Sequence, residues 1–382
     1  MERTIAQGRL SGRTIVPGNL VFSVAQPEHE PDIRGLLREN EMDGWVRLSF
    51  EREPDAFAAD FGLSRSHAFI IARDQETGEA VGICERSVRD AFVDGEIRPL
   101  PYLGSLRVAP AHRHRIRVLR GGFAAVRSLL HQPADLPYAL TAIAAGNRTA
   151  QRVLGAGLPG LPSYWPAGEL STFAMRTARA STPLRVEPAV AADLPAIAVL
   201  LQRVYRRFQF APVWRLNDLQ RLLSGGGLRI DHFLVVRRGP GVRACLAVWD
   251  QSGAKQTIIR GYAPWLASIR PVVNLATPFT AMPRLPPVGS PLRQVYLSHV
   301  AVEDDDPALF RSLLAAGLAQ AHRRGFEVAL AGFASGHPFC TIVKLRRPVT
   351  YRSLLFVVHW QDNAPAAKSV SPQMPYPEIA LM

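Results

Sequence analysis

The sequence predicts an α/β protein, of the α+β type, built from two similar units in tandem over its 382 residues. Short apolar segments with the length and spacing of strands alternate with segments that have the 3.6-residue period of amphipathic helices. The same order of elements occurs twice, in residues 21–176 and again in residues 184–361. Across the two units, Tyr102–Val108 aligns without a gap with Tyr296–Val302, as a duplication predicts.

The first unit begins with a strand and an amphipathic helix, followed by a hairpin whose turn is Glu76–Glu79. A strand, a long helix, a strand, a short helix and a closing strand complete it. The predicted ranges are Val21–Ala25, Glu30–Glu39, Phe69–Ala72, Ala80–Cys84, Leu103–Val108, a helix that includes Val118–Leu130, Ala139–Ile143, Asn147–Leu154 and Ser171–Met175.

The second unit repeats this order, with a hairpin around Gly239–Gly241. Thr177–Pro183, of mostly small and polar residues, is the predicted linker. Residues 1–20 and 362–382 are rich in Gly, Pro, Ser and Ala without sustained periodicity, so we expect tails there. The predicted ranges in the second unit are Leu184–Glu187, Asp193–Val204, Phe233–Val236, Ala244–Trp249, Gln294–Val302, Pro307–Ala321, Glu327–Ala331 and Leu354–Val358.

The composition is that of a folded protein, since 47% of the residues are hydrophobic and 20% are charged. No apolar run reaches the roughly 20 residues that a membrane span needs, and the N-terminus lacks the layout of a secretory signal. Cys84, Cys245 and Cys340 are widely spaced and show no metal-ligand spacing. We therefore expect a cytoplasmic protein with no metal and no membrane partner.

The net charge of +13 comes almost entirely from arginine, because only Lys255, Lys344 and Lys368 are lysines. These arginines are spread along the chain and no basic run is interleaved with aromatic residues. This pattern favours a coding bias over a nucleic-acid site, so we expect no specific nucleic-acid partner. The oligomeric state is not indicated by the sequence.

One turn carries a sharper signal than the overall charge. After the predicted strand Leu103–Val108, an Arg-rich turn leads into a helix, and Arg113, Arg115, Arg117 and Arg120 surround the helix start. The first amides of a helix have no internal partner, and the helix dipole favours an anion there. The pattern predicts a site for a phosphate-bearing cofactor; a solvated helix start is the alternative.

Leu106–Pro110, Arg113 and Asn147–Ala150 resemble the GNAT superfamily of acyl-CoA-dependent N-acyltransferases. In addition, Gly157–Pro166 resembles a subset of bacterial proteins with two GNAT-like units in tandem. The resemblance implies that each unit has a mixed, mostly antiparallel, splayed central sheet flanked by helices. It also implies acetyl-CoA or another acyl-CoA as co-substrate, and a primary amine of a small molecule or a protein as acceptor.

The resemblance assigns residues to the cofactor. The backbone at the end of the strand would bind the pantetheine arm, and an N–H near Val108 would stabilise the oxyanion. The Arg-rich turn would hold the pyrophosphate, and Asn147 would contact the cofactor from the other side, although Asn147 equally suits a helix N-cap. The expected cofactor-binding residues are Leu106, Arg107, Val108, Arg113, His114, Arg115, Ile116, Arg117, Val118 and Asn147.

The turn departs from the family pattern, because the usual glycines fall on Ile116 and Val118. Glycine lets the backbone approach a phosphate closely, which Ile and Val do less well. The family often has a Tyr where Leu154 stands, as the acid that protonates the leaving thiolate. Tyr164 is the nearest substitute and our candidate acid, with simple packing as the alternative.

The general base is the other open position. The carboxylate that often precedes the strand end in this family is replaced by Ser105. Glu85 and Glu96 are candidates by their proximity in the sequence, and Glu96 is our candidate catalytic carboxylate. Proton loss through water is an alternative. His299, on an apolar strand, is interpreted as a core or cleft histidine.

The second unit carries Glu303-Asp304-Asp305-Asp306 where the pyrophosphate would lie. Like charges repel across such a contact, so we expect this unit to be degenerate and to serve as scaffold or substrate wall. The leading hypothesis is an N-acyltransferase whose first unit binds acyl-CoA. The alternative is a non-catalytic tandem protein that binds a ligand or a partner.

Overall fold

The computed structural model describes residues 14–16, 19–180, 182, 184–225, 227–239, 241–277, 280 and 283–382. Most of the expected N-terminal tail, residues 1–20, lies outside the described residues. The part that is described includes a short strand, β1 (Thr14–Val16), which pairs with β2 (Leu20–Val24).

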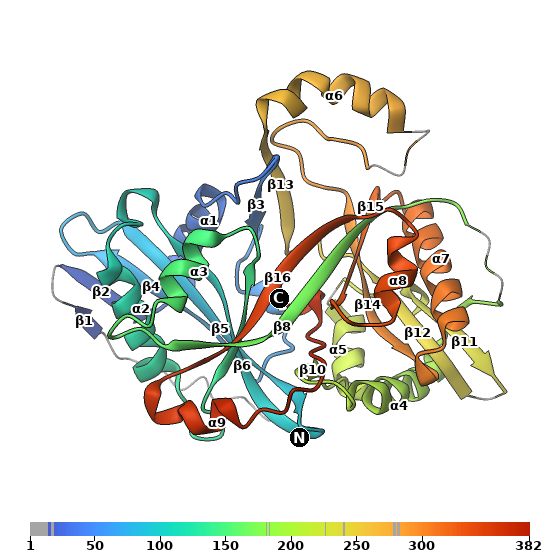
Figure 1. The fold of residues 1–382 in the computed structure, drawn as a ribbon, viewed down its shortest axis with the longest axis horizontal. Helices are drawn as coiled ribbons and strands as arrows, with labels where there is room; N and C mark the ends of the chain where they lie inside the picture. The colour runs from blue at the N-terminus through green and yellow to red at the C-terminus, as the bar shows by residue number, and fades with distance from the viewer. Residues whose placement is uncertain are drawn as a thin grey trace.

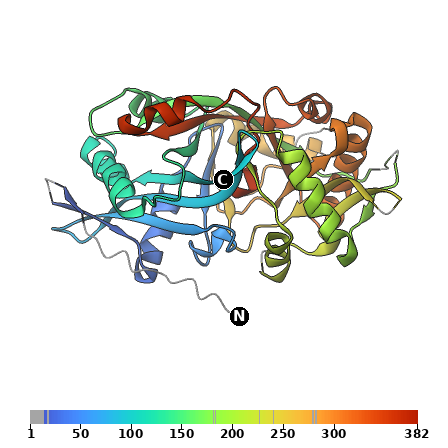
Figure 2. The same cartoon turned by 90° about the horizontal axis from the view of Figure 1, so that it is seen from below.

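One long mixed sheet runs through the whole molecule, with the two units side by side (Figures 1 and 2). Its strands follow the order β1-β2-β4-β5-β6-β7-β16-β8-β15-β14-β12-β11-β9, and β10 pairs with β5. Their bounds, beyond β1 and β2, are β4 (Ser66–Asp74), β5 (Ala80–Val93), β6 (Glu96–Val108), β7 (Ala139–Ala144), β8 (Ser163–Arg176), β9 (Glu187–Pro188), β10 (Ala211–Pro212), β11 (Phe233–Arg238), β12 (Gly241–Trp249), β14 (Gln294–Val302), β15 (Val328–Ala334) and β16 (Val349–His359).

Helices cover both faces of this sheet. In the first unit, apolar residues of one helix pack against Phe69 and Ile71, and those of another pack against Ile70 and Ala72. Because successive side chains of a strand point to opposite faces, the two helices, α1 and α2, lie on opposite sides of the sheet. The helices are α1 (Glu30–Glu39), α2 (Ile116–Leu130), α3 (Arg148–Gly155), α4 (Leu194–Tyr205), α5 (Leu216–Gly225), α6 (Pro264–Ala276), α7 (Pro307–Arg323), α8 (Phe339–Lys344) and α9 (Ala364–Lys368).

The two units exchange strands at the centre of the sheet. β8, which ends the first unit in sequence, pairs with β15 of the second unit. β16, late in the second unit, pairs antiparallel with both β7 and β8. These two long strands cross the middle of Figure 1. A continuous ladder of hydrogen bonds therefore joins the units, in addition to the covalent linker.

The internal repeat predicted from the sequence has a structural counterpart. β6 pairs with β5, and β14 pairs with β12, and each pairing is interrupted by a bulge. At the bulges Ser105 has φ 48° and His299 has φ 52°, and these two residues occupy the same position of the gap-free alignment. A positive φ is uncommon outside glycine. Its recurrence at aligned positions is therefore a specific sign of duplication.

Several elements were not expected from the sequence, among them α5, α6, α8 and a separate two-stranded ribbon of β3 (Val46–Glu51) and β13 (Gln256–Tyr262). The expected strand Leu184–Glu187 shrinks to β9, because Leu184 and Arg185 are outside the pairing at the sheet edge. None of the helices in the described ranges is both long and apolar enough to span a membrane.

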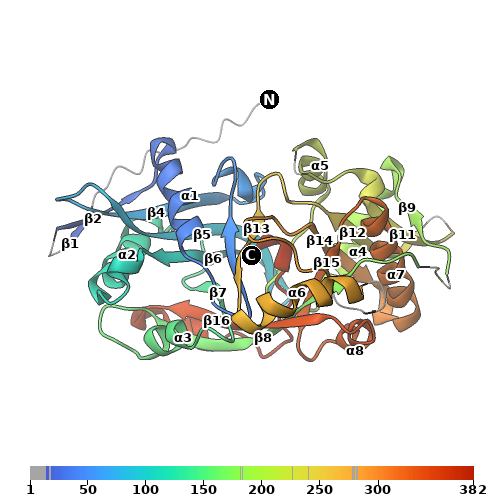
Figure 3. The ribbon, with the colours of Figure 1, turned by 90° about the horizontal axis from the view of Figure 1, so that it is seen from above.

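The segment from residue 362, expected as a tail, is packed into the molecule. Tyr376 and Ala380 are buried, and the C-terminus lies at the centre in all three views (Figures 1, 2 and 3). The Pro- and Ser-rich composition indicated no periodicity, and the few apolar residues that fill the interior are spaced irregularly. This packed end of the chain bears directly on the second unit, as described below.

Candidate active site

The central sheet opens next to the end of β6. β6 and β7 are parallel neighbours, yet they pair at a single position, Tyr102 with Leu140. Thr141 Oγ1 then donates to the carbonyl of Leu103 at 2.7 Å. Past this point β6 keeps its pairing with β5 only, and β7 continues beside β16. The splay that the resemblance implied is present, and it leaves one edge of Leu106–Val108 without a strand partner. Such an edge can bind an extended ligand arm.

Arg107 lies in this opening without an acidic partner among the described residues. Its Nη1 donates to the neighbouring carbonyl of Leu106 at 3.0 Å, and its Nε is buried without a hydrogen bond. Burial lowers the pKa of Arg107, and the charges of Arg52 and Arg113 lower it further. An anionic group bound here would relieve both effects, because it would pair the buried cation.

The Arg-rich turn forms the start of α2, as predicted. Arg115 is the N-cap, makes no side-chain capping bond, and the first turn of the helix has no acidic residue. Arg113 donates to Asn40 Oδ1 at 3.0 Å. In the part of the chain that is described, no ion pair involves Arg113, Arg115, Arg117 or Arg120. Free amides and uncompensated guanidinium groups at one helix start suit a phosphate.

The missing glycines of the turn have a partial replacement on the sheet. Val118, a buried residue of the first turn of α2, faces Gly82 of β5. A Cβ on Gly82 would lie 3.2 Å from Val118 Cγ1 and 3.3 Å from the Arg107 carbonyl oxygen. The close approach of turn and sheet is therefore supplied by a glycine of the strand. Ile116 is half-buried and His114 is exposed beside it.

Asn147 caps α3, because its Oδ1 accepts a hydrogen bond from the Ala150 amide at 3.0 Å. The residue is exposed. Asn147 therefore acts as a helix N-cap in this structure, and its contact with the cofactor stays a prediction.

Tyr164 lies on β8, where it pairs with Val358 of β16. Its ring contacts the Phe356 ring edge-on, with the two ring centroids 5.9 Å apart. It packs in the same apolar cluster as Leu106. Burial raises the pKa of Tyr164, and the nearby Cys84 adds to the rise. The phenol is therefore neutral and keeps its proton, as an acid must before it donates.

Glu96 is not brought to this place. It pairs with Val93 where the β5–β6 hairpin turns, its side chain is 69% exposed, and its nearest cation is Arg206 at 3.5 Å. Twelve residues of extended strand separate it from Val108, about 40 Å. β6 begins at Glu96 instead of Leu103, and this extra length carries Glu96 away from the splay.

Glu85 is the carboxylate that the bulge does bring to the splay. Ser105 Oγ donates to Glu85 Oε2 at 2.9 Å, Arg52 binds both carboxylate oxygens at 2.9 and 2.5 Å, and His67 Nε2 lies 2.8 Å from Oε1. Burial acts to raise the pKa of Glu85. The charge of Arg52 and the hydrogen bonds from His67 and Arg52 outweigh it and hold this pKa well below its usual range. We call Arg52, His67, Glu85 and Ser105 the bulge cluster.

A second cation lies near the bulge cluster, beside the packed C-terminal segment. Lys255 Nζ donates to the carbonyl of Ala380 at 3.3 Å. Burial lowers the pKa of Lys255 to about 7, and the charges of Arg52 and Arg89 contribute. Arg89 in turn donates to the carbonyl of Leu381 at 2.8 Å. The end of the chain thus contacts both units, through Arg89 of the first and Lys255 of the second.

In the second unit the corresponding opening is filled. β14 and β15 pair over Gln294–Tyr296 and then separate. Glu378 Oε2 accepts the His299 amide at 3.1 Å, and the Tyr376 hydroxyl donates to the Val300 carbonyl at 3.4 Å. Ile379 covers Gly332 so closely that a Cβ there would collide with it. We call Tyr376–Leu381 the C-terminal plug.

The turn of the second unit differs in charge as well. Glu303 binds Arg203 and Arg243 at 2.9 and 2.6 Å, and Asp305 binds Arg207 at 2.9 Å. Asp306 caps α7 by accepting the amides of Ala308 and Leu309. The helix start is therefore already occupied by carboxylates of the chain itself.

Solved structures of other proteins resemble this chain over most of its length. One is Saccharomyces cerevisiae N-myristoyltransferase with bound myristoyl-CoA, with a TM-score of 0.61 and 12% identity over 91% of this chain and 84% of that one. Another is a GCN5-related N-acetyltransferase from Sphaerobacter thermophilus, with a TM-score of 0.55 and 12% identity over 90% and 96%. No family model and no curated protein matches the sequence. The likeness confirms the predicted fold class: this chain has a GNAT-type fold in two tandem units.

Proposed function

We propose that this protein is an N-acyltransferase that transfers an acyl group from acyl-CoA to a primary amine, and that its first unit binds the acyl-CoA. The observation that carries the proposal is the open edge of Leu106–Val108 next to a helix start with four arginines that make no ion pair within the described ranges. A thioester with a nucleotide tail needs both features, one for its extended arm and one for its phosphates. The fold, shared with two N-acyltransferases, supports the same activity.

In this proposal the residues of the first unit position the co-substrate. The free edge of Leu106–Val108 holds the pantetheine arm, and a backbone N–H near Val108 stabilises the developing oxyanion. Arg113, Arg115 and Arg117 bind the phosphates through side chains and helix amides. Acyl-CoA supplies the activated acyl group, and the protein supplies orientation.

In this proposal the bulge cluster, and not Glu96, supplies the general base. Glu85 stays ionised and orients His67, and an imidazole is the side chain best suited to accept a proton near neutral pH. We assign to His67 and Glu85 the removal of the proton from the attacking amine, and to Tyr164 the protonation of the leaving thiolate. The acceptor is a small-molecule amine or a protein amine.

The second unit, in this proposal, does not bind acyl-CoA and forms a wall of the acceptor site. The C-terminal plug and the carboxylates of the turn support this assignment, since one fills the opening and the other repels phosphate. We therefore expect one acyl-CoA bound per chain.

The test is a thermal-shift and calorimetric titration with acetyl-CoA. A bound ligand at 100 times its Kd stabilises a protein by about 2.7 kcal/mol, so the melting temperature should rise. Arg113→Glu should abolish the rise. Arg311→Glu is the matched control, because Arg311 is an exposed arginine on α7, the corresponding helix of the second unit.

Release of free thiol in the presence of a panel of amines then tests the transfer itself. If millimolar acetyl-CoA produces neither a shift nor heat, the first unit does not bind it, and the alternative of a non-catalytic binding protein stands. If acetyl-CoA binds but no amine in the panel accelerates thiol release, the assignment of proton transfer to the bulge cluster fails.

A further inference from the structure

Helix α6 stands apart from the body of the molecule and exposes an apolar face. It projects above the sheet in Figure 1 and lies across the centre in Figure 3. Trp265 is 50% exposed, Ile269 43%, Val272 68% and Leu275 79%. Leu266 alone among the residues of α6 is buried. Surface helices of folded proteins turn such residues inward, and a contiguous exposed apolar patch marks an interaction site.

One residue outside the helix extends this face. Trp45, which precedes β3, is 72% exposed and meets Trp265 edge-on at 5.5 Å. Trp265, Ile269 and Val272 follow the i, i+4, i+7 spacing that places side chains on one side of a helix. We call Trp45, Trp265, Ile269, Val272 and Leu275 the docking face.

The free charge on and beside α6 is mainly positive. Residues 251–302 contain no aspartate or glutamate. Arg270 of α6 and the exposed Arg284 make no ion pair among the described residues, whereas Arg260 is bound to Glu51 and the ammonium group of Lys255 is buried. The exposed Asp43, two residues before Trp45, is the acidic residue beside them. The whole chain carries +13. In a symmetric dimer the same patch meets itself, so a second copy would bring like charges together. An anionic bilayer offers both of the complementary features, an apolar interior and a negative surface.

We propose that the docking face binds the surface of a bilayer that contains anionic lipids, with its tryptophans at the level of the headgroups and without spanning it. Tryptophan is enriched at that level, where an apolar ring with one polar edge is stable. The sequence predicts no membrane partner; this surface becomes visible only in the structure, because exposure of α6 cannot be inferred from its apolar residues.

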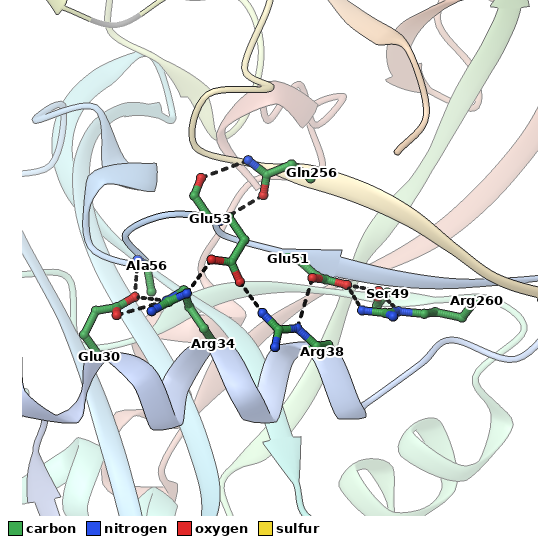
Figure 4. Close-up of polar contacts among 9 residues, drawn as sticks. All are labelled: Glu30, Arg34, Arg38, Ser49, Glu51, Glu53, Ala56, Gln256 and Arg260. Atoms are coloured by element: carbon green, nitrogen blue, oxygen red, sulfur yellow. Dashed lines mark hydrogen bonds and ion pairs between the residues drawn. The ribbon is translucent and has the colours of Figure 1, made fainter. Parts of the chain in front are cut away.

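β13, which leads directly into α6, is joined to β3 of the first unit (Figure 4). Arg260 of β13 binds Ser49 Oγ at 2.8 Å and also binds Glu51, and Arg38 of α1 binds Glu53 at 2.6 Å. Gln256 donates to the Glu53 carbonyl at 2.9 Å. β3 then leads directly to Arg52 of the bulge cluster. A protein docked through α6 would therefore have its candidate active site at a fixed orientation to the lipid surface.

The test uses the full-length protein with vesicles of phosphatidylcholine alone and with phosphatidylglycerol added. We expect sedimentation with the anionic vesicles and a blue shift of tryptophan fluorescence. Ile269→Glu with Val272→Glu should weaken the partition on the order of tenfold or more, because apolar contacts are lost and negative charge is added. Val199→Glu is the matched control, since Val199 is 65% exposed on α4, at the opposite edge of the molecule in Figure 1.

Trp45→Phe together with Trp265→Phe should remove most of the blue shift, because the proposal places these two tryptophans in the headgroups. Three results would overturn it. The first is no binding to anionic vesicles at low salt. The second is equal binding by the double variant, which would place the contact elsewhere on this basic protein. The third is that the native chain binds no vesicles but self-associates in solution, as measured by ultracentrifugation, and that the double variant does not self-associate. The occupant of the docking face would then be a protein.

Discussion

The bulge of β6 and the bulge of β14 share a backbone conformation, yet each meets a different carboxylate. Glu85 accepts the hydroxyl of Ser105 and is paired with Arg52, which keeps it ionised. Glu378 accepts the amide of His299, and burial raises its pKa to about 7. The comparison shows that one strand geometry can serve an open, charged site or a closed, nearly neutral one. The surrounding side chains decide which.

The starts of α2 and α7 also differ in charge. The turn before α2 presents arginines that no acidic residue of the described chain neutralises, whereas the turn before α7 presents carboxylates that arginines already bind. A duplicated fold has kept its backbone in both units while its charges have diverged. Each of the following experiments probes one part of this difference.

The largest effect is expected at Glu85. Glu85→Ala leaves the buried Arg52 without its carboxylate, and removing one partner of a buried ion pair costs about 3–5 kcal/mol. Urea unfolding measures this loss. Arg52→Met together with Glu85→Leu should recover most of it, because no unpaired charge remains. A loss below about 1 kcal/mol for the single variant would contradict the ionised pair, since that is the range of an exposed one.

Glu378 should make stability depend on pH in the opposite direction to Glu85, because the pKa of Glu85 is lowered and that of Glu378 is raised. Its pKa is about 7 in the folded chain against an ordinary value of 4.5, so the folded state holds this proton more tightly. The resulting stability is complete below pH 4.5 and is lost as the pH rises to about 7, in total about 3 kcal/mol. Glu378→Gln, which cannot ionise, should therefore gain on the native chain over this interval. Parallel unfolding free energies from pH 4.5 to 8 would refute the assignment; Glu96→Gln, at an exposed position, is the control.

Gly332→Ala tests the C-terminal plug itself. The added methyl collides with Ile379, and overpacking of this kind costs about 1–3 kcal/mol. Gly146→Ala, where a Cβ meets nothing within 4 Å, should have little effect. Calorimetry with acetyl-CoA should still give one site per chain for the variant, because the carboxylates before α7 remain. Two sites would mean that the plug alone closes the second unit.

The smallest effect is expected at Arg120. Its stem lies 3.5 Å from the position of a Cβ on Gly160 and its guanidinium has no acidic partner in the described ranges. Arg120→Ala should leave the melting temperature almost unchanged and weaken acetyl-CoA binding by about threefold to tenfold, the size of one charge-assisted contact. Arg311→Ala provides the comparison. An unchanged Kd would remove Arg120 from the phosphate site.

The sequence was informative where a pattern is local. The 3.6-residue period predicted α1 with its observed bounds, and apolar segments on either side of turn residues predicted the two hairpins. The gap-free repeat predicted a duplication, to which the aligned bulges correspond. The Arg-rich turn was found because its residues are contiguous. Glu85 was noted only as a neighbour in sequence, and the buried charge inside an apolar strand was the signal that could have ranked it above Glu96.

Other features depend on distant parts of the chain meeting in space. Arg52 and Glu85 are 33 residues apart and neither predicts the other. The C-terminal plug has no periodicity, and β3 pairs with β13 across two hundred residues. The exposure of α6 is likewise a property of the whole structure, because an apolar helix segment has the same sequence whether it is buried or exposed.

The strand exchange has a consequence for synthesis on the ribosome. β7 pairs with β16, and β8 pairs with both β15 and β16. These partner strands are translated more than 150 residues later than β8. Until then these strands present unpaired edges, which are templates for aggregation. The nascent amino-terminal half therefore cannot mature on its own, and its completion is delayed until nearly the whole chain has emerged. A gene truncated before Val349 should yield an insoluble product even though every residue of the proposed thioester site is encoded in it.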